Sequence, residues 1–436
     1  MSKGRHRFTL VEYAKPVALV EQISAAIERP KDEARRLLTK GGHRTAHSLG
    51  FKENPITTDE SGTLAIKVAG LLRLGPSLEL EIVPKFLGTG DGGGSWREDF
   101  FFLATLSRHG RLLASDRLRA SGGAPADLSV LVARAMTAMY WDQHRRPLRT
   151  YRRVKETDFF IDGDIDPFDL AFPEASGYEQ EVIRLTRNNR HNAVISAAAK
   201  SLVPEVSDPR AAAGLLRMSG HLGEKRSLHR TNASRSRLPS RSRRWQPLVD
   251  VANDVIQGLG MSYQRGAASA PGFVVGTWQI WQDLITTASR LGFGAQRVHA
   301  DIPSALGSRT KLPGGSVTPL QVYPDVMVSP ATSRPFLLDA KYKGHIDKGR
   351  LIVSEADIYE SMAFSQATQR DTVILAYPAP ASDPLSAVGS TRAFEQVNVG
   401  GIRVIAIYVE VRGISKRGGL SAFSSRLASD LVTLTM

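Results

Sequence analysis

The stretch QVYPDVMVSPATSRPFLLDAKYKG, residues 321–344, decides the fold of the C-terminal third of this chain. Two apolar, strand-like runs flank the turn-rich segment SPATSRP, which predicts a β-hairpin. A symmetrical register places Asp325 beside Asp339. Because side chains alternate along a strand, Asp339 and Lys341 project from the same face. The sequence therefore predicts two carboxylates and one ammonium group at one end of a hairpin.

This combination of side chains is suited to the metal-dependent hydrolysis of phosphodiesters. Carboxylate oxygens bind Mg²⁺, which keeps several waters, and one such water is a nucleophile. We expect Asp325 and Asp339 to hold Mg²⁺, with Mn²⁺ as a substitute, and the Ala340 carbonyl to add a ligand. Lys341 would orient the attacking water or stabilise charge on the phosphate. A surface hairpin with an Asp–Lys ion pair would have the same sequence pattern, so the short motif by itself is also compatible with a purely structural role.

The elements around the hairpin favour the catalytic interpretation. An apolar helical pattern precedes it at residues 276–292, and a second helix is predicted at residues 354–368, followed by the apolar strand TVILAYP. This order resembles that of the PD-(D/E)xK nucleases, in which the acidic pair lies on adjacent strands.

Composition indicates a polyanionic partner. The chain has 436 residues and a formal charge of +14, which points first to nucleic acid and second to an anionic membrane surface. The absence of cysteine excludes disulfides and thiolate zinc sites. No run approaches the roughly 20 apolar residues that cross a bilayer, and MSKGRHRFTL lacks the apolar core of a signal peptide. We therefore expect a cytoplasmic protein that makes no use of a membrane.

The chain is expected to be α+β overall, with an α/β nuclease domain that carries a mixed sheet flanked by helices and ends in a polar tail. The predicted regions are a β-rich N-terminal region (1–90), a mainly helical middle region (91–223), a basic flexible segment (224–245) and the nuclease domain (246–436). The basic segment contains eight Lys or Arg residues from Lys225 onward. It is either an arm that contacts DNA phosphates or a solvated connection between helices.

Three parts of the sequence resemble the McrC family of McrBC-type 5-methylcytosine restriction systems. They are LELEIVPKF (78–86), NAVISAAAKSL (192–202), and the pair PDV (324–326) with LLDAKYK (337–343). The resemblance implies a subunit that joins an AAA+ GTPase of the McrB type in a hetero-oligomeric complex, stimulates GTP hydrolysis and supplies the DNA-cleaving site. It also implies that the N-terminal half contacts the motor. The chain has no P-loop sequence, so it is not itself the motor.

The sequence departs from the family pattern at two helix positions. Where the family usually places Glu on the helix before the hairpin, this chain has Gln282, followed by Asp283. Adjacent helical residues point about 100° apart, so Asp283 is not a simple replacement. In the helix after the hairpin, the segment DIYESMAF presents Glu360 and Phe364 where the family has Gln and Tyr. We take Glu360 as a candidate that compensates for the missing acid.

Two other functional readings remain open. In the first, the altered helix position disables cleavage and the chain is a DNA-binding adaptor that activates the GTPase. In the second, the chain is a nuclease that acts without a motor, which leaves its long N-terminal half unexplained. Retention of Asp325, Asp339 and Lys341 argues against the adaptor.

Several other patterns are expected to be structural. Glu79 and Glu81 alternate with apolar residues and indicate one solvent-facing side of a strand. Trp278 and Trp281 lie three residues apart and indicate a buried helical face. Lys85 lies at the end of the strand that contains Glu79 and Glu81. It is compatible with a structural role at that strand end or with a contact to a partner. The acidic run IDGDIDPFD (161–169) lacks the final Glu of a calcium loop and indicates a turn.

Overall fold

A computed structural model describes residues 6–75, 78–88, 96–109, 128–172, 174–222, 238–256, 273–343, 345–347 and 350–436. The chain forms two compact units, one made of Met1–Leu131 with Gln264–Met436 and the other of Val132–Tyr263. This division differs from the predicted boundaries, because the N-terminal region belongs to the same unit as the hairpin. Helix α9 (Gln246–Ile256), which was predicted to belong to the nuclease domain, belongs to the second unit, where it packs on α7 (Arg190–Leu202).

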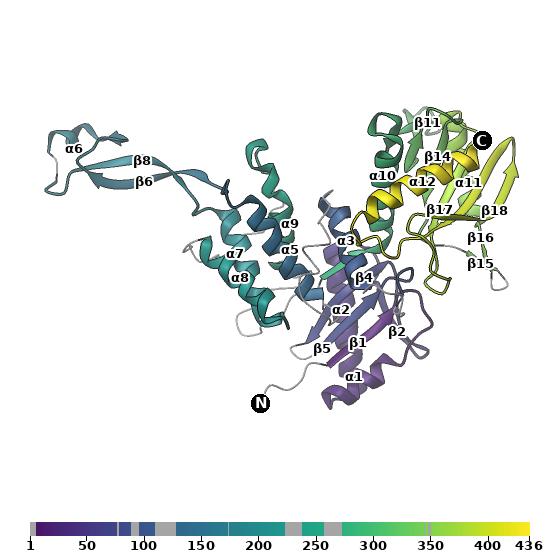
Figure 1. Cartoon of the computed structure of the whole chain (residues 1–436), viewed down its shortest axis with the longest axis horizontal. Coiled ribbons are helices and arrows are strands. Elements are labelled where there is room, and N and C mark those ends of the chain that lie inside the picture. Colours follow the sequence, from purple (N-terminus) through teal and green to yellow (C-terminus); the bar gives the residue numbers. More distant parts are fainter. Residues whose placement is uncertain are drawn as a thin grey trace. The chain divides into compact units, whose positions relative to one another are not determined.

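The first unit combines helices with several small sheets and one larger sheet (Figure 1). Its helices are α1 (Leu19–Ile27), α2 (Lys31–Leu49), α3 (Trp96–His109), α10 (Thr277–Phe293), α11 (Glu355–Thr368) and α12 (Gly419–Thr435). Its N-terminal strands are β1 (His6–Val11), β2 (Ile56–Asp59), β3 (Gly62–Ala65), β4 (Val68–Gly75), β5 (Leu78–Val83) and β9 (Phe273–Gly276). Its C-terminal strands are β10 (Val298–Ala300), β11 (Ser304–Thr310), β12 (Val317–Val322), β13 (Val326–Val328), β14 (Phe336–Ala340), β15 (His345–Asp347), β16 (Arg350–Ile352), β17 (Thr372–Pro378), β18 (Thr391–Val399) and β19 (Ile402–Val409).

The larger sheet has six strands in the order β10-β13-β14-β17-β19-β18. Strands β14, β17 and β19 are parallel, and the other pairs are antiparallel, so the predicted mixed sheet is confirmed. One face packs Leu337 and Val373 against Phe364 of α11. On the other face, Phe336 meets Phe293 of α10 with 5.9 Å between ring centroids. Because helices cover both faces, the central strands are apolar along their length rather than alternating.

The predicted polar tail is wrong, because the chain ends in helix α12. This helix buries Phe423, Leu427 and Leu431 and packs on α10. A Cβ at Gly292 of α10 would lie 2.7 Å from the Ala428 Cβ, so glycine allows the close approach of the two helices. The apolar positions of α12 recur three and four residues apart, which is the signal that the sequence analysis missed.

The N-terminal sheet has the order β1-β5-β4-β9. The predicted strand pair is confirmed, since β4 and β5 are antiparallel with Gly75 opposite Leu78. Strand β9 pairs with β4 and runs directly into α10, which packs on the six-stranded sheet. The four-stranded and the six-stranded sheets therefore belong to one unit, because β9 of the first sheet continues directly into α10, the helix that covers the second.

The prediction that Glu79 and Glu81 face solvent is wrong, because both are buried. Arg7 donates to Glu79 over 2.9 Å, and Arg97 of α3 donates to Glu81 through two bonds of 2.7 Å. All six residues of β5 are buried, so both faces of the strand are covered, and Arg7 and Arg97 are the partners of the two carboxylates. Buried carboxylates require such partners.

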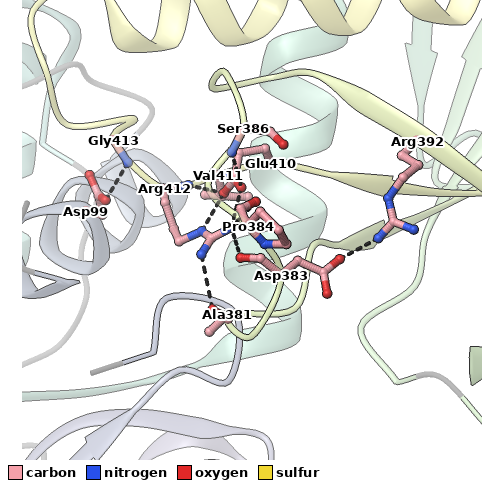
Figure 2. A network of polar contacts seen from close by, with 10 residues as sticks. All are labelled: Asp99, Ala381, Asp383, Pro384, Ser386, Arg392, Glu410, Val411, Arg412 and Gly413. Carbon is pink, nitrogen blue, oxygen red and sulfur yellow. Dashed lines mark hydrogen bonds and ion pairs between the residues drawn. The ribbon is translucent and has the colours of Figure 1, made fainter. Parts of the chain in front are cut away.

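Helix α3 is also tied to the loop after β19 (Figure 2). Asp99 accepts hydrogen bonds from the backbone N–H groups of Gly413 (2.7 Å) and Ser415 (2.9 Å). Nearby, Arg412 donates to Glu410 over 2.6 Å and to the carbonyl of Ala381 over 3.1 Å. The Asp99 hydrogen bonds join the N-terminal and C-terminal segments of the first unit, and the Arg412 contacts hold the C-terminal loop that receives them.

The second unit packs helices α5 (Leu128–Gln143, from Val132 onward), α7, α8 (Pro209–His221) and α9, and it carries an extended antiparallel arm (Figure 1). The arm consists of β6 (Thr150–Asp158) and β8 (Tyr178–Thr186), with β7 (Asp164–Ile165) and the short helix α6 (Pro167–Ala171) at its tip. The predicted helix at NAVISAAAKSL is confirmed as α7. The prediction that the acidic run forms a turn is wrong, because the run contains β7 and the start of α6, with Asp166 between them as the cap of α6.

Residues 224–237 of the predicted basic segment lie outside the described residues. Its last six residues form the 3-10 helix Ser240–Trp245, and the Trp245 indole donates to the carbonyl of Arg146 over 3.0 Å. This end of the segment is therefore part of a packed structure rather than a flexible linker. Across the described parts of the chain, no helix has the length and apolar character needed to span a membrane.

Candidate functional site

The predicted register of the hairpin is confirmed. Strands β13 and β14 are antiparallel with Val326 opposite Leu338, so the residues one step further along, Asp325 and Asp339, face each other at the end of the pair. The connecting segment SPATSRP is the turn that the sequence indicated. The two carboxylates are thus brought together by local strand pairing and turn chemistry.

Asp325 is held by one backbone and one side-chain donor. The N–H of Ala340 donates to its Oδ2 over 2.8 Å, and Nε2 of Gln282 on α10 donates to its Oδ1 over 2.7 Å. Burial, and then the neighbouring charge of Asp339, raise the pKa of Asp325 to about 8. Without a cation, this carboxyl therefore keeps its proton near neutral pH.

Lys341 lies among three carboxylates. Its Nζ is 2.7 Å from Asp339, 3.3 Å from Asp357 and 2.5 Å from Glu360. Burial alone lowers the pKa of Lys341, but the charges and hydrogen bonds of Asp339 and Glu360 raise it above its ordinary value. The ammonium form is therefore strongly favoured. Glu360, a predicted candidate, contacts this ammonium group, whereas Gln282 contacts the acidic pair.

Asp357 is a site residue that the sequence analysis did not single out. It lies three residues before Glu360 on α11, so the two side chains are neighbours on one helical face that meets Lys341. Ser354 caps the helix and donates to Asp357 over 2.7 Å. The spacing D-x-x-E in DIYE was the available signal.

The acidic pair offers the oxygen donors of a cation site. Oδ2 of Asp339 is buried and lies 2.7 Å from Nζ of Lys341, so the ammonium balances its charge in the absence of a metal. Among the residues that the structure describes, no group of three or more Asp, Glu or His is placed to hold a metal. The arrangement suits a hard divalent cation that binds Asp325 and Asp339 and completes its shell with neutral oxygens and water. The Ala340 carbonyl as a ligand stays a prediction.

The two tryptophans of α10 differ. Trp281 is fully buried, and its Nε1 donates to the carbonyl of Ala376 over 2.9 Å, which confirms the predicted core position. Trp278 is 40% exposed, so its predicted burial is wrong.

Lys85 donates to the carbonyl of Tyr342 and lies 4.5 Å from the centroid of the Tyr342 ring. Its contacts are therefore made inside the first unit, next to the candidate site.

Comparison with known proteins places the chain in a family. No curated protein sequence matches it. One solved structure, a chain from a refined half-complex of a tetradecameric assembly of Thermococcus gammatolerans McrB AAA+ hexamers with bound McrC, is similar with a TM-score of 0.68 and 13% identity, covering 98% of this chain and 100% of that one. A chain of the Thermococcus gammatolerans McrBC complex shows a weaker likeness, with a TM-score of 0.44 and 15% identity over 65% of this chain and 86% of that one. The first match shows a shared fold.

The sequence itself carries the assignment. Residues 64–378 match the family described as "McrBC 5-methylcytosine restriction system component". That range includes the β4–β5 hairpin, helix α7, the Asp325–Asp339 pair and Lys341. Because the match spans well over half of the chain, the chain belongs to the McrBC 5-methylcytosine restriction system component family.

Proposed function

We propose that this protein is the McrC-type nuclease subunit of a restriction complex and that it cleaves DNA by Mg²⁺-dependent hydrolysis of phosphodiester bonds. The observation that carries the proposal is the pairing of Asp325 with Asp339 at the end of the β13–β14 hairpin, with the Lys341 ammonium 2.7 Å from Oδ2 of Asp339. Family membership and the charge of +14 support DNA as the substrate.

The residues of the site divide the chemistry among them. A bound Mg²⁺ would supply an activated water and neutralise charge on the scissile phosphate. Asp325 and Asp339 would hold this cation, and Asp325 would give up its proton to bind it. Lys341 stays protonated because Asp339 and Glu360 raise its pKa, so it acts as a hydrogen-bond donor to the phosphate or to the attacking water rather than as a base.

The second part of the proposal is a partner, an AAA+ GTPase of the McrB type. The similar structure contains McrB AAA+ hexamers with bound McrC. In the second unit, the tip of the β6–β8 arm exposes large apolar side chains, which are Phe159, Phe160, Ile161, Phe168 and Phe172. A cluster of this kind at the end of a projecting arm is typical of a protein-binding surface.

An adaptor without nuclease activity is the second candidate. It is favoured by Gln282, whose amide donates a hydrogen bond to Oδ1 of Asp325. An acid at this position would instead add a third negative metal ligand. In that reading the protein stimulates the GTPase and binds DNA, and the acidic pair is a structural remnant.

One experiment separates the two candidates. Methylated and unmethylated plasmids are incubated with Mg²⁺, GTP and the AAA+ partner, using wild type and Lys341→Ala. We expect wild type to cleave DNA and the variant to lose cleavage while GTPase stimulation persists. GTPase stimulation by wild type without cleavage of either plasmid would establish the adaptor instead.

A further inference from the structure

A buried carboxylate outside the acidic pair bridges two elements of the candidate site. Glu12 follows β1 and is 1% exposed. Its Oε1 accepts a hydrogen bond from Thr277 over 2.7 Å, and its Oε2 accepts one from the Tyr342 hydroxyl over 2.5 Å. Thr277 is the first residue of α10, the helix that carries Gln282, and Tyr342 directly follows Lys341. One side chain from the N-terminal sheet thus joins the helix of Gln282 to the strand end of Lys341.

Tyr342 is also held at its backbone and on its ring. Lys85 donates to its carbonyl, and Phe86 packs edge-on against its ring with 5.9 Å between centroids. The N–H of Glu12 donates to the carbonyl of Val83, which fixes the end of β1 to the end of β5. Tyr342 is therefore fixed at its hydroxyl, ring and carbonyl by residues from the N-terminal sheet.

The preceding residue is anchored from the opposite side. The N–H of Lys341 donates to the carbonyl of Ala376 on β17 over 2.9 Å. The backbone at Lys341 is thus held by the six-stranded sheet. The next residue, Tyr342, is held by its contacts with Glu12 and Lys85. A lysine side chain has four rotatable bonds and loses much conformational freedom when it is ordered. A backbone that is fixed on both sides of Lys341 lowers the cost of keeping its ammonium among three carboxylates.

We infer that Glu12 and Lys85 are positioning residues of the proposed nuclease site, which act through Tyr342 to hold the Lys341 ammonium in place. The inference rests on the proposed function and adds to it a role for the N-terminal sheet. This sheet completes the support of the site, so the nuclease unit is not confined to the C-terminal third.

The test uses the full-length chain and two conservative variants, Tyr342→Phe and Glu12→Gln. Tyr342→Phe removes the hydroxyl donor, and Glu12→Gln replaces one of the two acceptor oxygens by an NH2 donor, so that Thr277 and Tyr342 compete for the oxygen that is left; both variants keep the side-chain volume. We expect the kcat of Mg²⁺-dependent cleavage to fall about tenfold with little change in the KM for DNA, because a small misplacement of a catalytic group costs at least that much. The double variant should lose no more than either single variant, since both break the same contact.

A second readout does not depend on cleavage. Acetylation of Lys341 by an amine-reactive ester, followed by peptide mass spectrometry, reports whether its ammonium is held, with exposed Lys200 as the internal reference. We expect Lys341 to be modified several-fold faster in both variants than in wild type. If wild type fails to cleave DNA, the proposed nuclease function fails, and the labelling rates still decide the inference.

The matched control is Tyr140→Phe, which removes a buried tyrosine hydroxyl that contacts His221 over 2.5 Å in the second unit. This variant should lose a comparable amount of thermal stability without a change in kcat or in Lys341 labelling. The inference is overturned if Tyr342→Phe and Glu12→Gln show wild-type labelling of Lys341, or if their kcat falls no further than that of Tyr140→Phe.

Discussion

Gln282 donates a 2.7 Å hydrogen bond to Asp325, and this contact defines how the site differs from one with a third acid. A glutamate at this position would repel Asp325 in the absence of a cation and would share a cation when one is bound. The neutral amide instead stabilises the acidic pair without a metal. The residue on the helix thus sets how strongly folding and metal binding depend on each other.

Replacing Gln282 by Glu should make the site more dependent on metal. We expect Gln282→Glu to bind Mg²⁺ about tenfold more tightly, because it adds a negative ligand in place of a donor. In the presence of a chelator, the same variant should melt at a lower temperature than wild type. Calorimetric titration and thermal melts measure the two effects. An unchanged Mg²⁺ affinity would show that Gln282 lies outside the metal shell.

Removal of the Lys341 ammonium should strongly reduce cleavage. Loss of a donor that stabilises developing charge costs on the order of 10²–10³ in kcat. Lys341→Ala is therefore expected to reduce single-turnover cleavage by that factor. Lys341→Arg serves as the comparison, since it keeps the charge but changes the geometry. Full activity of Lys341→Ala would exclude a catalytic role for this side chain.

Stability without metal should fall as the pH rises. The folded protein keeps a proton on Asp325 up to a pKa of about 8, whereas an ordinary aspartate releases it near 3.8. The contribution of this group to stability is therefore fully present below pH 3.8 and is lost as the pH rises through about 8. In a chelating buffer, Asp325→Asn should gain melting temperature relative to wild type as the pH rises across this window. A constant difference between the two proteins would contradict the assigned pKa.

The buried pair of Glu81 and Arg97 should be important for folding. Their side chains are 2% and 18% exposed. We expect Glu81→Ala to destabilise the first unit by about 3–5 kcal/mol, because it leaves Arg97 without its carboxylate. Urea denaturation followed by tryptophan fluorescence measures this change. Glu21→Ala, which breaks an exposed pair with Lys31, is the control and should leave the urea midpoint unchanged.

The apolar tip of the β6–β8 arm should bind the AAA+ partner. Substituting Phe160 and Phe168, which are 79% and 70% exposed, by Ser should weaken complex formation and GTPase stimulation. Neither side chain is buried, so the melting temperature should not fall. Analytical gel filtration with the partner and a GTPase assay test this. Undiminished stimulation by the double variant would exclude the tip as the contact surface.

Local patterns in the sequence determined much of the site. The turn-rich segment between two apolar runs fixed the hairpin, and the two-residue period of a strand placed Asp325, Asp339 and Lys341 together. Helical spacing identified α7 and α10. These features were predictable because each depends on residues close together in the chain.

Tertiary structure decided the support around that site. The contact of Glu12 with Tyr342 joins residues 330 positions apart, and no periodicity or spacing in the sequence predicts such a pair. The burial of Glu79 and Glu81 also depends on distant arginines, so a strand that alternates charged and apolar residues was taken as half-exposed. The sequence alone thus determined the hairpin and its acids. Long-range packing decided which carboxylates are buried, which residue anchors Lys341, and that the N-terminal sheet belongs to the same unit.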